Sequence, residues 1–161
     1  MYKNGKILSV EEKQMKKVDI FTDGACSSNP GPGGWCAILK CDGVEKILSG
    51  SEKETTNNRM ELTAVIKALD ALKFSCIVTV TTDSKYVCDA VNQRWVYSWR
   101  DNNWRKKDKK PALNPDLWQL LLELLEKHSV TFCWVKGHND HPENERCDAL
   151  AVLETKNFKI G

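Results

Sequence analysis

Five segments of the chain have the alternating or continuous apolar pattern of β-strands. They are rich in β-branched and aromatic residues and are bounded by residues that favour turns. The first three follow one another closely, and the Asp-Gly pair at 42–43 is typical of a hairpin, so together they predict an antiparallel meander. The predicted strands are 18–23, 34–41, 44–51, 77–83 and 130–136.

Apolar residues at helical spacing predict helices after the third strand. From Asn58, a residue that also suits a helix N-cap, Val65, Ala68 and Leu72 fall on one stripe. Asn114-Pro115 is typical of a helix start, because asparagine caps well and proline fits the first turn. The other predicted helices are 84–92, a Trp- and Arg-rich helix from about 94, and one opening at Pro142.

The resulting order, β-β-β-α-β-α-α-α-β-α, predicts an α/β fold. We expect a five-stranded mixed sheet, in which a three-strand antiparallel meander is joined by parallel strands and flanked by helices. The 161 residues suit one domain. Residues 1–17 are polar and lack periodicity, so we expect a flexible N-terminal tail before a single domain at 18–161.

Composition excludes several classes of protein. No apolar run approaches the roughly 18 residues that span a membrane, and the N-terminus has no secretory signal pattern. The seven cysteines are odd in number and contain no C-x-x-C pair, which argues against a zinc site of the usual type and against a disulfide framework. We therefore expect a soluble cytoplasmic protein that acts as a monomer.

The net charge of +2 hides an uneven distribution. Residues 94–110 carry seven basic and two acidic side chains, and residues 1–17 carry five basic and two acidic ones. The rest of the chain is therefore net acidic. Such asymmetry favours a polyanionic partner bound at the basic segments and a cationic ligand, such as a metal ion, held by the acidic body.

Four carboxylates occupy positions where an acidic residue is unexpected. Asp23 and Asp83 end strands, and parallel strands would bring both to the carboxyl edge where open α/β sheets bind ligands. Glu61 lies on the apolar stripe of its helix, and Asp148 has apolar neighbours three and four residues later. Carboxylates meeting at one edge would repel one another unless divalent cations were bound. Oxygen ligands favour Mg²⁺ or Mn²⁺ over zinc.

Each of these carboxylates also has a purely structural explanation. Aspartates at strand ends often cap turns or the next helix. Glu61 would complement the helix dipole if it lay in the first turn, and Asp148 could pair with Arg146 or with a lysine. Convergence of all four at one place is what separates the two explanations.

Five segments, in this order, resemble ribonuclease H of type 1, and the resemblance covers about residues 18–154. The chain would then be an endonuclease that hydrolyses the RNA strand of RNA–DNA hybrids and leaves 5′-phosphate and 3′-hydroxyl ends. No carboxylate of the family is missing. The segments are TDGACSSNPGPGG, TTNNRMELTAVIKAL, TDSKYV, the basic stretch at 94–110 and WVKGHNDHPENERCDALA.

The resemblance also implies the roles of the catalytic residues. The family's metal-binding carboxylates fall on Asp23, Glu61, Asp83 and Asp148, which would hold two Mg²⁺ ions, with Mn²⁺ as a substitute. One ion would activate water and the other would stabilise the leaving 3′ oxygen. His138 matches a histidine of a mobile loop that assists proton transfer or product release; the alternative is a solvent-exposed loop histidine.

Substrate contacts are implied at further positions. Lys85 replaces a glutamine found in many relatives, which should favour phosphate over base contact. Asn144 would orient the substrate or a metal ligand. The remaining minor-groove and phosphate positions are Gly24, Cys26, Asn29, Thr56, Asn57 and Asn58.

The segment at about 94–110 matches the basic protrusion of the family. Trp95 is expected to face the DNA sugars, whereas Trp99 either contacts DNA or packs the protrusion onto the body. Trp118 and Trp134 are expected in the core. The other predicted contacts of the protrusion are Trp104, Lys106 and Lys107.

Two alternative functions remain open on sequence grounds. One is another nuclease or strand transferase of the same fold, which would share the carboxylates but not the GHxxHPENERCD segment or the protrusion. The other is a hybrid-binding module without cleavage, against which the complete set of carboxylates argues. An assay with Mg²⁺ and labelled hybrid, duplex and single-stranded substrates separates the three.

Overall fold

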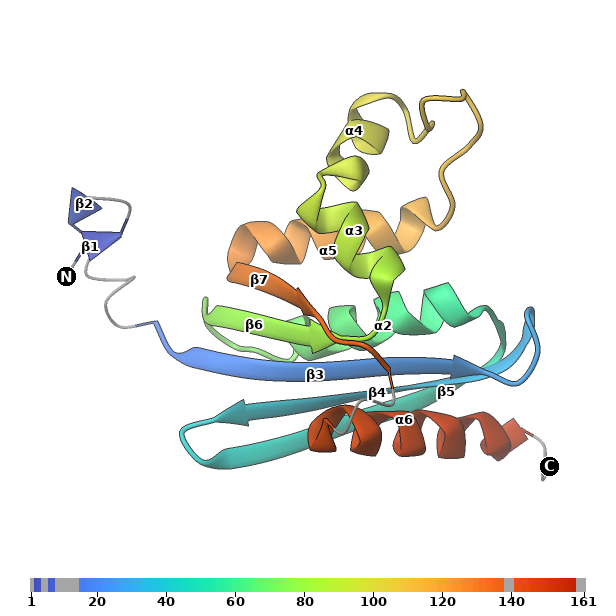
Figure 1. Ribbon diagram of the computed structural model, residues 1–161, viewed down its shortest axis with the longest axis horizontal. Coiled ribbons are helices and arrows are strands. Elements are labelled where there is room, and N and C mark those ends of the chain that lie inside the picture. Colours follow the sequence, from blue (N-terminus) through green and yellow to red (C-terminus); the bar gives the residue numbers. More distant parts are fainter. Residues whose placement is uncertain (1, 4–5, 8–14, 138–140, 159–161) are drawn as a thin grey trace.

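The computed structural model describes residues 2–3, 6–7, 15–137 and 141–158. From residue 17 onward, the described elements follow the predicted order (Figure 1). The elements are β1 (Tyr2–Lys3), β2 (Lys6–Ile7), β3 (Lys17–Cys26), β4 (Gly31–Cys41), β5 (Val44–Thr55), α2 (Asn57–Asp70), β6 (Ile77–Thr82), α3 (Lys85–Asn92), α4 (Trp95–Asp101), α5 (Pro115–Lys127), β7 (Ser129–Trp134), α6 (Pro142–Thr155) and a 3₁₀ turn (Lys156–Phe158).

The main sheet has five strands in the order β5-β4-β3-β6-β7. β3 pairs antiparallel with β4, and β4 with β5, so the predicted meander is confirmed. β6 pairs parallel with β3 and with β7. The carboxyl ends of β3, β6 and β7 therefore lie at the same edge of the sheet, which is the arrangement that the sequence predicts.

The first strands are longer than their sequence pattern predicts. β3 continues past Asp23 to Cys26, and β4 begins at Gly31, so much of the predicted turn is paired strand. Cys26 pairs with Gly33 on one side of β4, and Gly33 pairs with Glu52 of β5 on the other. Glycine and proline favour turns in isolation, but hydrogen-bond partners on both sides outweigh that weak local preference.

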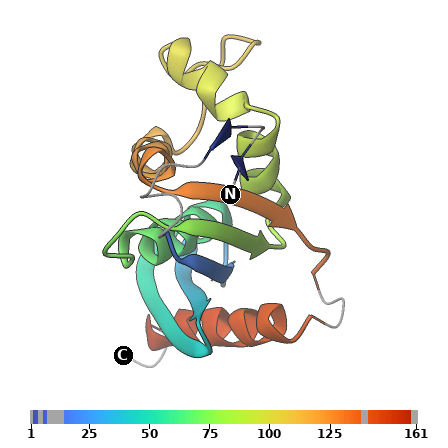
Figure 2. The same cartoon turned by 90° about the vertical axis from the view of Figure 1, so that its left-hand side faces the viewer.

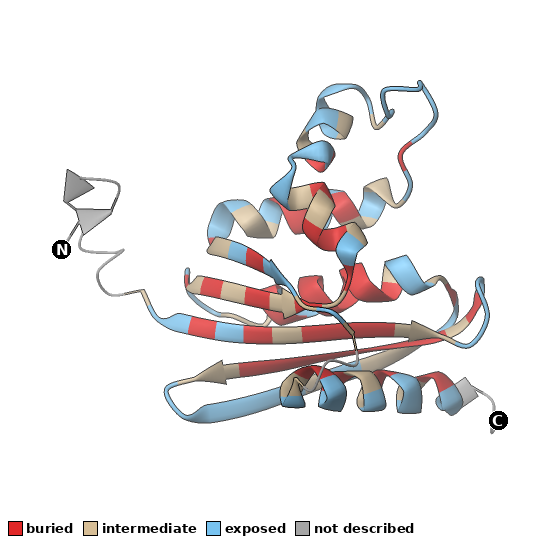
Figure 3. Ribbon diagram, in the orientation of Figure 1, coloured by how far each residue is buried: buried red, intermediate tan, exposed pale blue. Residues whose placement is uncertain are grey.

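Helices pack against both faces of the sheet (Figure 2). In β4, Cys36 and Ile38 pack in the cluster that contains α6 residues, whereas Ala37 and Leu39 pack in the larger cluster formed with α2 and α5. All four side chains are buried, because successive residues of a strand point to opposite faces and both faces are covered. Figure 3 shows the buried residues concentrated in β3, β4 and α2.

The two tryptophans expected in the core, Trp118 and Trp134, differ in burial. Trp118 of α5 is fully buried, and its Nε1–H donates to the Tyr86 hydroxyl at 2.9 Å, so that prediction is confirmed. Trp134 is 48% exposed, so the core prediction for it is wrong. It is the last residue of β7, and β7 is an edge strand of the sheet, so few neighbours are available to cover it.

Residues 94–110 project from the body of the protein, as the upper part of Figure 1 shows. Val96 anchors α4 in the core, and a bridge between Arg105 and Pro111 closes the loop that follows. All four lysines of that loop are exposed. The basic side chains are thus displayed to solvent on a projecting segment.

Little of the N-terminal segment is described. β1 and β2 pair antiparallel, a pairing that the sequence pattern does not predict, and β3 begins at Lys17. The flexible tail at 1–17 stays a prediction. Among the described residues, none of the helices combines the length and the apolar character that crossing a membrane would require.

Candidate active site

Carboxylates from three separate elements meet at the carboxyl edge of the sheet. Asp23 lies on β3, Glu61 on α2, and Asp83 directly follows β6. Each of the three offers a carboxylate oxygen, and these oxygens all lie within 4.8 Å of one another. Three side chains that are distant in the sequence therefore form one acidic group.

The parallel pairing of β3 with β6 accounts for the two aspartates. Thr22 pairs with Thr82 at the end of the ladder, and each aspartate is the next residue of its chain segment. Asp23 and Asp83 therefore lie at the same level, although Asp23 stays paired with Cys36 of β4 whereas Asp83 lies just beyond the end of β6. This convergence was predicted from the two strand ends.

The start of α2 explains the position of Glu61. Thr56 is the N-cap of this helix, and its hydroxyl accepts a hydrogen bond from the backbone N–H of Arg59 at 3.3 Å. The capping role expected for Asn58 is therefore wrong. Glu61 is the fifth residue of the helix, beyond a first turn that holds no acidic residue. It does not serve as a first-turn complement to the dipole.

Burial makes this acidic group electrostatically costly. Asp23 and Glu61 are 3% and 4% exposed. Burial and the nearby Asp83 charge raise the pKa of Asp23 to about 8. Burial and the Asp23 charge likewise raise the pKa of Glu61 well above its usual value. Without a positive partner, the ionised group is therefore disfavoured at neutral pH.

A divalent cation fits this group of residues. Asp23 Oδ1 accepts the backbone N–H of Gly24 at 2.9 Å, but Asp23 Oδ2 and Glu61 Oε2 are buried without a hydrogen-bond partner among the described residues. Buried carboxylate oxygens that lack donors are suited to a hard cation, which would also relieve the repulsion between them. The chemistry of the donors thus favours Mg²⁺-like ions over zinc.

Asp148 lies at the rim of the same site. It lines an open cleft of about 360 Å³ with the three converging carboxylates, although it is not part of the group within 4.8 Å. Its half-buried side chain also contributes to raising the pKa of Asp23. Arg146 pairs with Glu45 instead, so the proposed Asp148–Arg146 pair is not formed.

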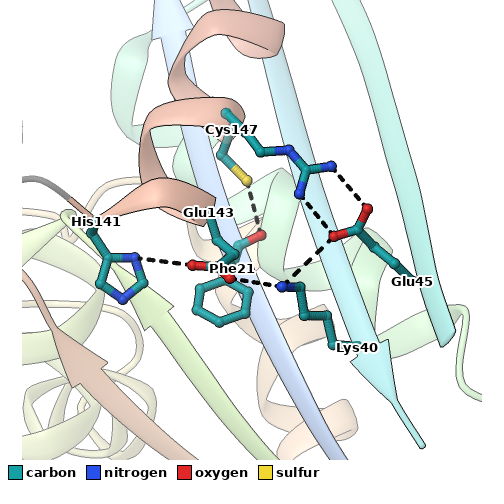
Figure 4. Close-up of polar contacts among 7 residues, drawn as sticks. Phe21, Lys40, Glu45, His141, Glu143 and Cys147 are labelled. Carbon is teal, nitrogen blue, oxygen red and sulfur yellow. Dashed lines mark hydrogen bonds and ion pairs between the residues drawn. The ribbon is translucent and has the colours of Figure 1, made fainter. Parts of the chain in front are cut away.

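An ion-pair cluster holds the N-terminal part of α6 against the sheet (Figure 4). Lys40 of β4 lies 2.7 Å from Glu143, and both Arg146 Nη atoms donate to Glu45 of β5 at 2.8 Å. The Cys147 thiol, one residue before Asp148, donates to the backbone carbonyl of Phe21 at 3.2 Å. These contacts fix the helix that carries Asp148 relative to the strand that carries Asp23.

Gly24 allows α2 to approach β3 closely, and replacing it with alanine should test this contact. The added Cβ would lie 2.5 Å from the backbone nitrogen of Glu61 and 2.8 Å from Met60 Cβ. We expect Gly24→Ala to destabilise the fold by about 1–3 kcal/mol and to weaken divalent-cation binding, because the helix must move. Denaturant unfolding and isothermal titration calorimetry measure the two effects.

Gly43→Asn is a matched control for this substitution. Gly43 has a positive φ of 78° but open space where a Cβ would lie, and asparagine tolerates that conformation. The change should alter stability by less than about 0.5 kcal/mol. If Gly24→Ala were equally mild, the close approach would not constrain the site.

Several predicted substrate residues lie at or behind the cleft. Gly24, Asn57, Asn58 and Lys85 line it directly. Asn29 Oδ1 accepts the backbone N–H of Asn57 at 3.1 Å, so the Asn29 side chain supports the start of α2. Thr56 is the N-cap of α2. The Cys26 thiol lies 2.7 Å from the Ser28 carbonyl and stabilises the turn after β3.

Two site residues, His138 and Asn144, were predicted in the segment that begins WVKGH, and the structure describes only Asn144. Asn144 is 4% exposed, and its Oδ1 has no hydrogen-bond partner among the described residues. His138 lies outside the described residues, so its catalytic role stays a prediction.

A second hollow of about 530 Å³ lies on the protrusion. It brings together four of the five predicted protrusion residues. The ring of Trp99 also meets Trp118 edge-on, with centroids 6.2 Å apart, so Trp99 both packs on the body and lines the hollow. Trp104 is not among the lining residues, which are Gln93, Arg94, Trp95, Ser98, Trp99, Lys106 and Lys107.

Other residues of the site were not predicted. Ser84 and Tyr86 line the cleft, and their position directly after Asp83 was the available signal. Trp134 was assigned to the core, yet its Nε1–H donates to the backbone carbonyl of Asp83 at 3.1 Å. Sequence position gave no indication of that contact.

Comparisons with known sequences agree with the geometry. The family model described as RNase H matches residues 15–156. A ribonuclease H of Nitratidesulfovibrio vulgaris (strain DP4) is 59% identical over 134 residues, which are 83% of this chain and 86% of that protein. A ribonuclease H of Rhizobium etli is 58% identical over 147 residues, 91% of this chain and 97% of that protein.

Comparison with solved structures also finds RNase H proteins. LC9-RNase H1, described as a type 1 RNase H with the type 2 active-site motif, has a TM-score of 0.77 and 31% identity, covering 89% of this chain and 74% of that one. LC11-RNase H1 in complex with RNA/DNA hybrid has a TM-score of 0.67 and 23% identity, covering 87% and 97%. The second likeness supports the fold alone.

Proposed function

The chain belongs to the ribonuclease H family, and from this premise we propose that it is an endonuclease that hydrolyses the RNA strand of RNA–DNA hybrids. The observation that carries the proposal is the meeting of Asp23, Glu61 and Asp83 within 4.8 Å in an open cleft. Two of these carboxylates have a buried oxygen without a hydrogen-bond partner among the described residues, which leaves that oxygen available to a metal ion.

Asp23, Glu61, Asp83 and Asp148 would hold the divalent cations. We propose two Mg²⁺ ions, with Mn²⁺ as a substitute, because oxygen donors suit both metals. When bound, the ions would neutralise charge on the scissile phosphate and supply a nucleophilic water, which leaves 5′-phosphate and 3′-hydroxyl ends. The protein's own contribution is to hold four carboxylates from four elements in place before the substrate arrives.

The surrounding residues would bind and orient the hybrid. Asn57, Asn58 and the backbone at Gly24 line the cleft and offer short polar groups to the RNA minor groove. Lys85 would contact phosphate. The exposed lysines of the protrusion would contact the DNA strand, with an affinity that falls as salt rises. His138 would assist proton transfer or product release, and the protein would act as a monomer.

One assay separates this proposal from its alternatives. The protein is incubated with Mg²⁺ and end-labelled hybrid, duplex DNA, duplex RNA and each single strand. We expect cleavage of only the RNA within the hybrid. Cleavage of duplex DNA would favour another nuclease of the same fold, and binding without cleavage in either metal would favour a hybrid-binding module.

A further inference from the structure

Trp134 is a large apolar side chain in an unexpected place. It is half exposed at the end of β7, where burial alone gives little reason for a tryptophan. Two polar neighbours contact it. Its Nε1–H donates to the Asp83 carbonyl at 3.1 Å, and Lys85 Nζ lies 5.8 Å from the centroid of its ring.

We propose that Trp134 is a positioning residue of the active site, which fixes the backbone that presents the Asp83 carboxylate and holds the Lys85 ammonium beside the cleft. The inference deepens the proposed function and rests on it. Trp134 would touch neither the cations nor the scissile phosphate. It would act through the two neighbours that line the cleft.

The backbone argument concerns the junction between β6 and α3. The carbonyl before Asp83 belongs to Thr82 and accepts the N–H of Val135, the residue directly after β7, at 3.0 Å. The carbonyl after it belongs to Ser84 and accepts the Cys88 N–H of the helix at 3.1 Å. The hydrogen bond from the Trp134 indole to the Asp83 carbonyl lies between these two backbone hydrogen bonds. It therefore limits rotation of the peptide that carries this metal-binding carboxylate.

The second argument concerns Lys85, which is exposed and carries a long, flexible side chain. It is the cationic residue among those that line the cleft. An ammonium within about 6 Å of an indole centroid is attracted to the ring. The ring would thereby hold the Lys85 ammonium beside the cleft, so that the side chain loses less conformational freedom when it binds a substrate phosphate.

Two substitutions at position 134 separate these contacts. Trp134→Phe keeps an aromatic ring but removes the N–H donor, whereas Trp134→Leu removes both. We expect Trp134→Phe to lower kcat about 10-fold with little change in KM, because a carboxylate is misplaced. We expect Trp134→Leu to lower kcat similarly and to raise KM about threefold, because Lys85 is released as well.

The Lys85 contact is isolated by a double-mutant cycle. Lys85→Met alone should raise KM and reduce the salt dependence of hybrid binding by about one phosphate contact. In the Lys85→Met background, Trp134→Leu should raise KM no further. A KM increase from Trp134→Leu that persists in that background would overturn the cation–π part of the proposal.

The Asp83 contact has a readout that does not depend on hydrolysis. Calorimetric titration with Mn²⁺ alone should show about threefold weaker binding to Trp134→Phe than to the wild type, at unchanged secondary structure. Cys133→Ser, an exposed change in the same strand, is the control and should leave cation affinity unchanged. Wild-type affinity and kcat in Trp134→Phe would overturn the positioning role.

These measurements also separate the two proposals. If the wild-type protein failed to cleave the hybrid, the proposed function would fail. The Mn²⁺ titration and the salt dependence of hybrid binding in EDTA would still test whether Trp134 acts on Asp83 and Lys85.

Discussion

Replacing Asp23 with asparagine is expected to abolish hydrolysis of the hybrid while hybrid binding largely survives. Asparagine has almost the same shape but lacks the negative charge that would hold a cation between Glu61 and Asp83. We expect a loss of about 10³-fold or more in kcat, because the stabilisation of developing charge disappears. The substrate contacts proposed at the cleft rim and on the protrusion remain unchanged.

Rates are measured at saturating Mg²⁺, and binding by fluorescence anisotropy of a labelled hybrid. Asp19→Asn is the matched control, because Asp19 lies on the same strand, four residues earlier, and is exposed. It should retain wild-type turnover. Retained turnover in Asp23→Asn would contradict the assignment of Asp23 as a metal ligand, whereas loss of binding in parallel would indicate a folding defect.

The metal-free protein is expected to lose stability as the pH rises from 5 to 8. The pKa of Asp23 is about 8 in the folded state against an ordinary value of 3.8. Between these values the folded state binds more protons than the unfolded state, so unfolding releases a proton and rising pH favours it. The stability contributed by protonated Asp23 is fully present below the pKa that Asp23 has in the unfolded state. It is lost as the pH rises through the pKa that Asp23 has in the folded state.

The pKa of Glu61 is raised in the same direction, which steepens this dependence. The loss from Asp23 alone should be on the order of 2–5 kcal/mol. Guanidinium unfolding in EDTA at pH 5 and pH 8 measures it. Saturating Mg²⁺ should remove the loss, because the cation stabilises the ionised carboxylates and binds only the folded state.

Comparison with Asp23→Asn isolates the contribution of one group. His128, whose pKa burial lowers, acts in the opposite direction, but it contributes equally to both proteins. We expect the metal-free Asp23→Asn protein to be more stable than the wild type at pH 8 and to show a flatter pH dependence. Identical dependence in the two proteins would mean that Asp23 is not destabilised by its surroundings. Burial disfavours the ionised carboxylates when no cation is bound, and for the same reason it favours binding of a cation that neutralises them.

Much of the fold follows from local patterns. The continuous apolar runs identify the strands of a sheet that is covered on both faces, and the change of period after the third strand identifies α2. The two aspartates could be placed at one edge because parallel strands share their direction. Glu61 could be placed near them because it interrupts an apolar stripe.

Other features depend on neighbours that are distant in the sequence. Gly31 and Gly33 favour a turn locally, yet they lie in a strand because β3 and β5 supply hydrogen-bond partners. Thr56 rather than Asn58 caps α2, a choice of two residues that propensity does not resolve. Arg146 pairs with Glu45, which lies 101 positions away.

The sequence by itself determined the order of the elements, the mixed sheet and the residues that form the acidic group, because periodicity and strand direction are properties of local chain geometry. Only the tertiary structure decided that Trp134 is exposed and bound to Asp83, that Asp148 lies at the rim, and that ion pairs hold α6 on the sheet. Whether a side chain is covered depends on which strand lies at the edge of the sheet and on the exact position of each packed helix. Those are outcomes of long-range packing, which no local pattern encodes.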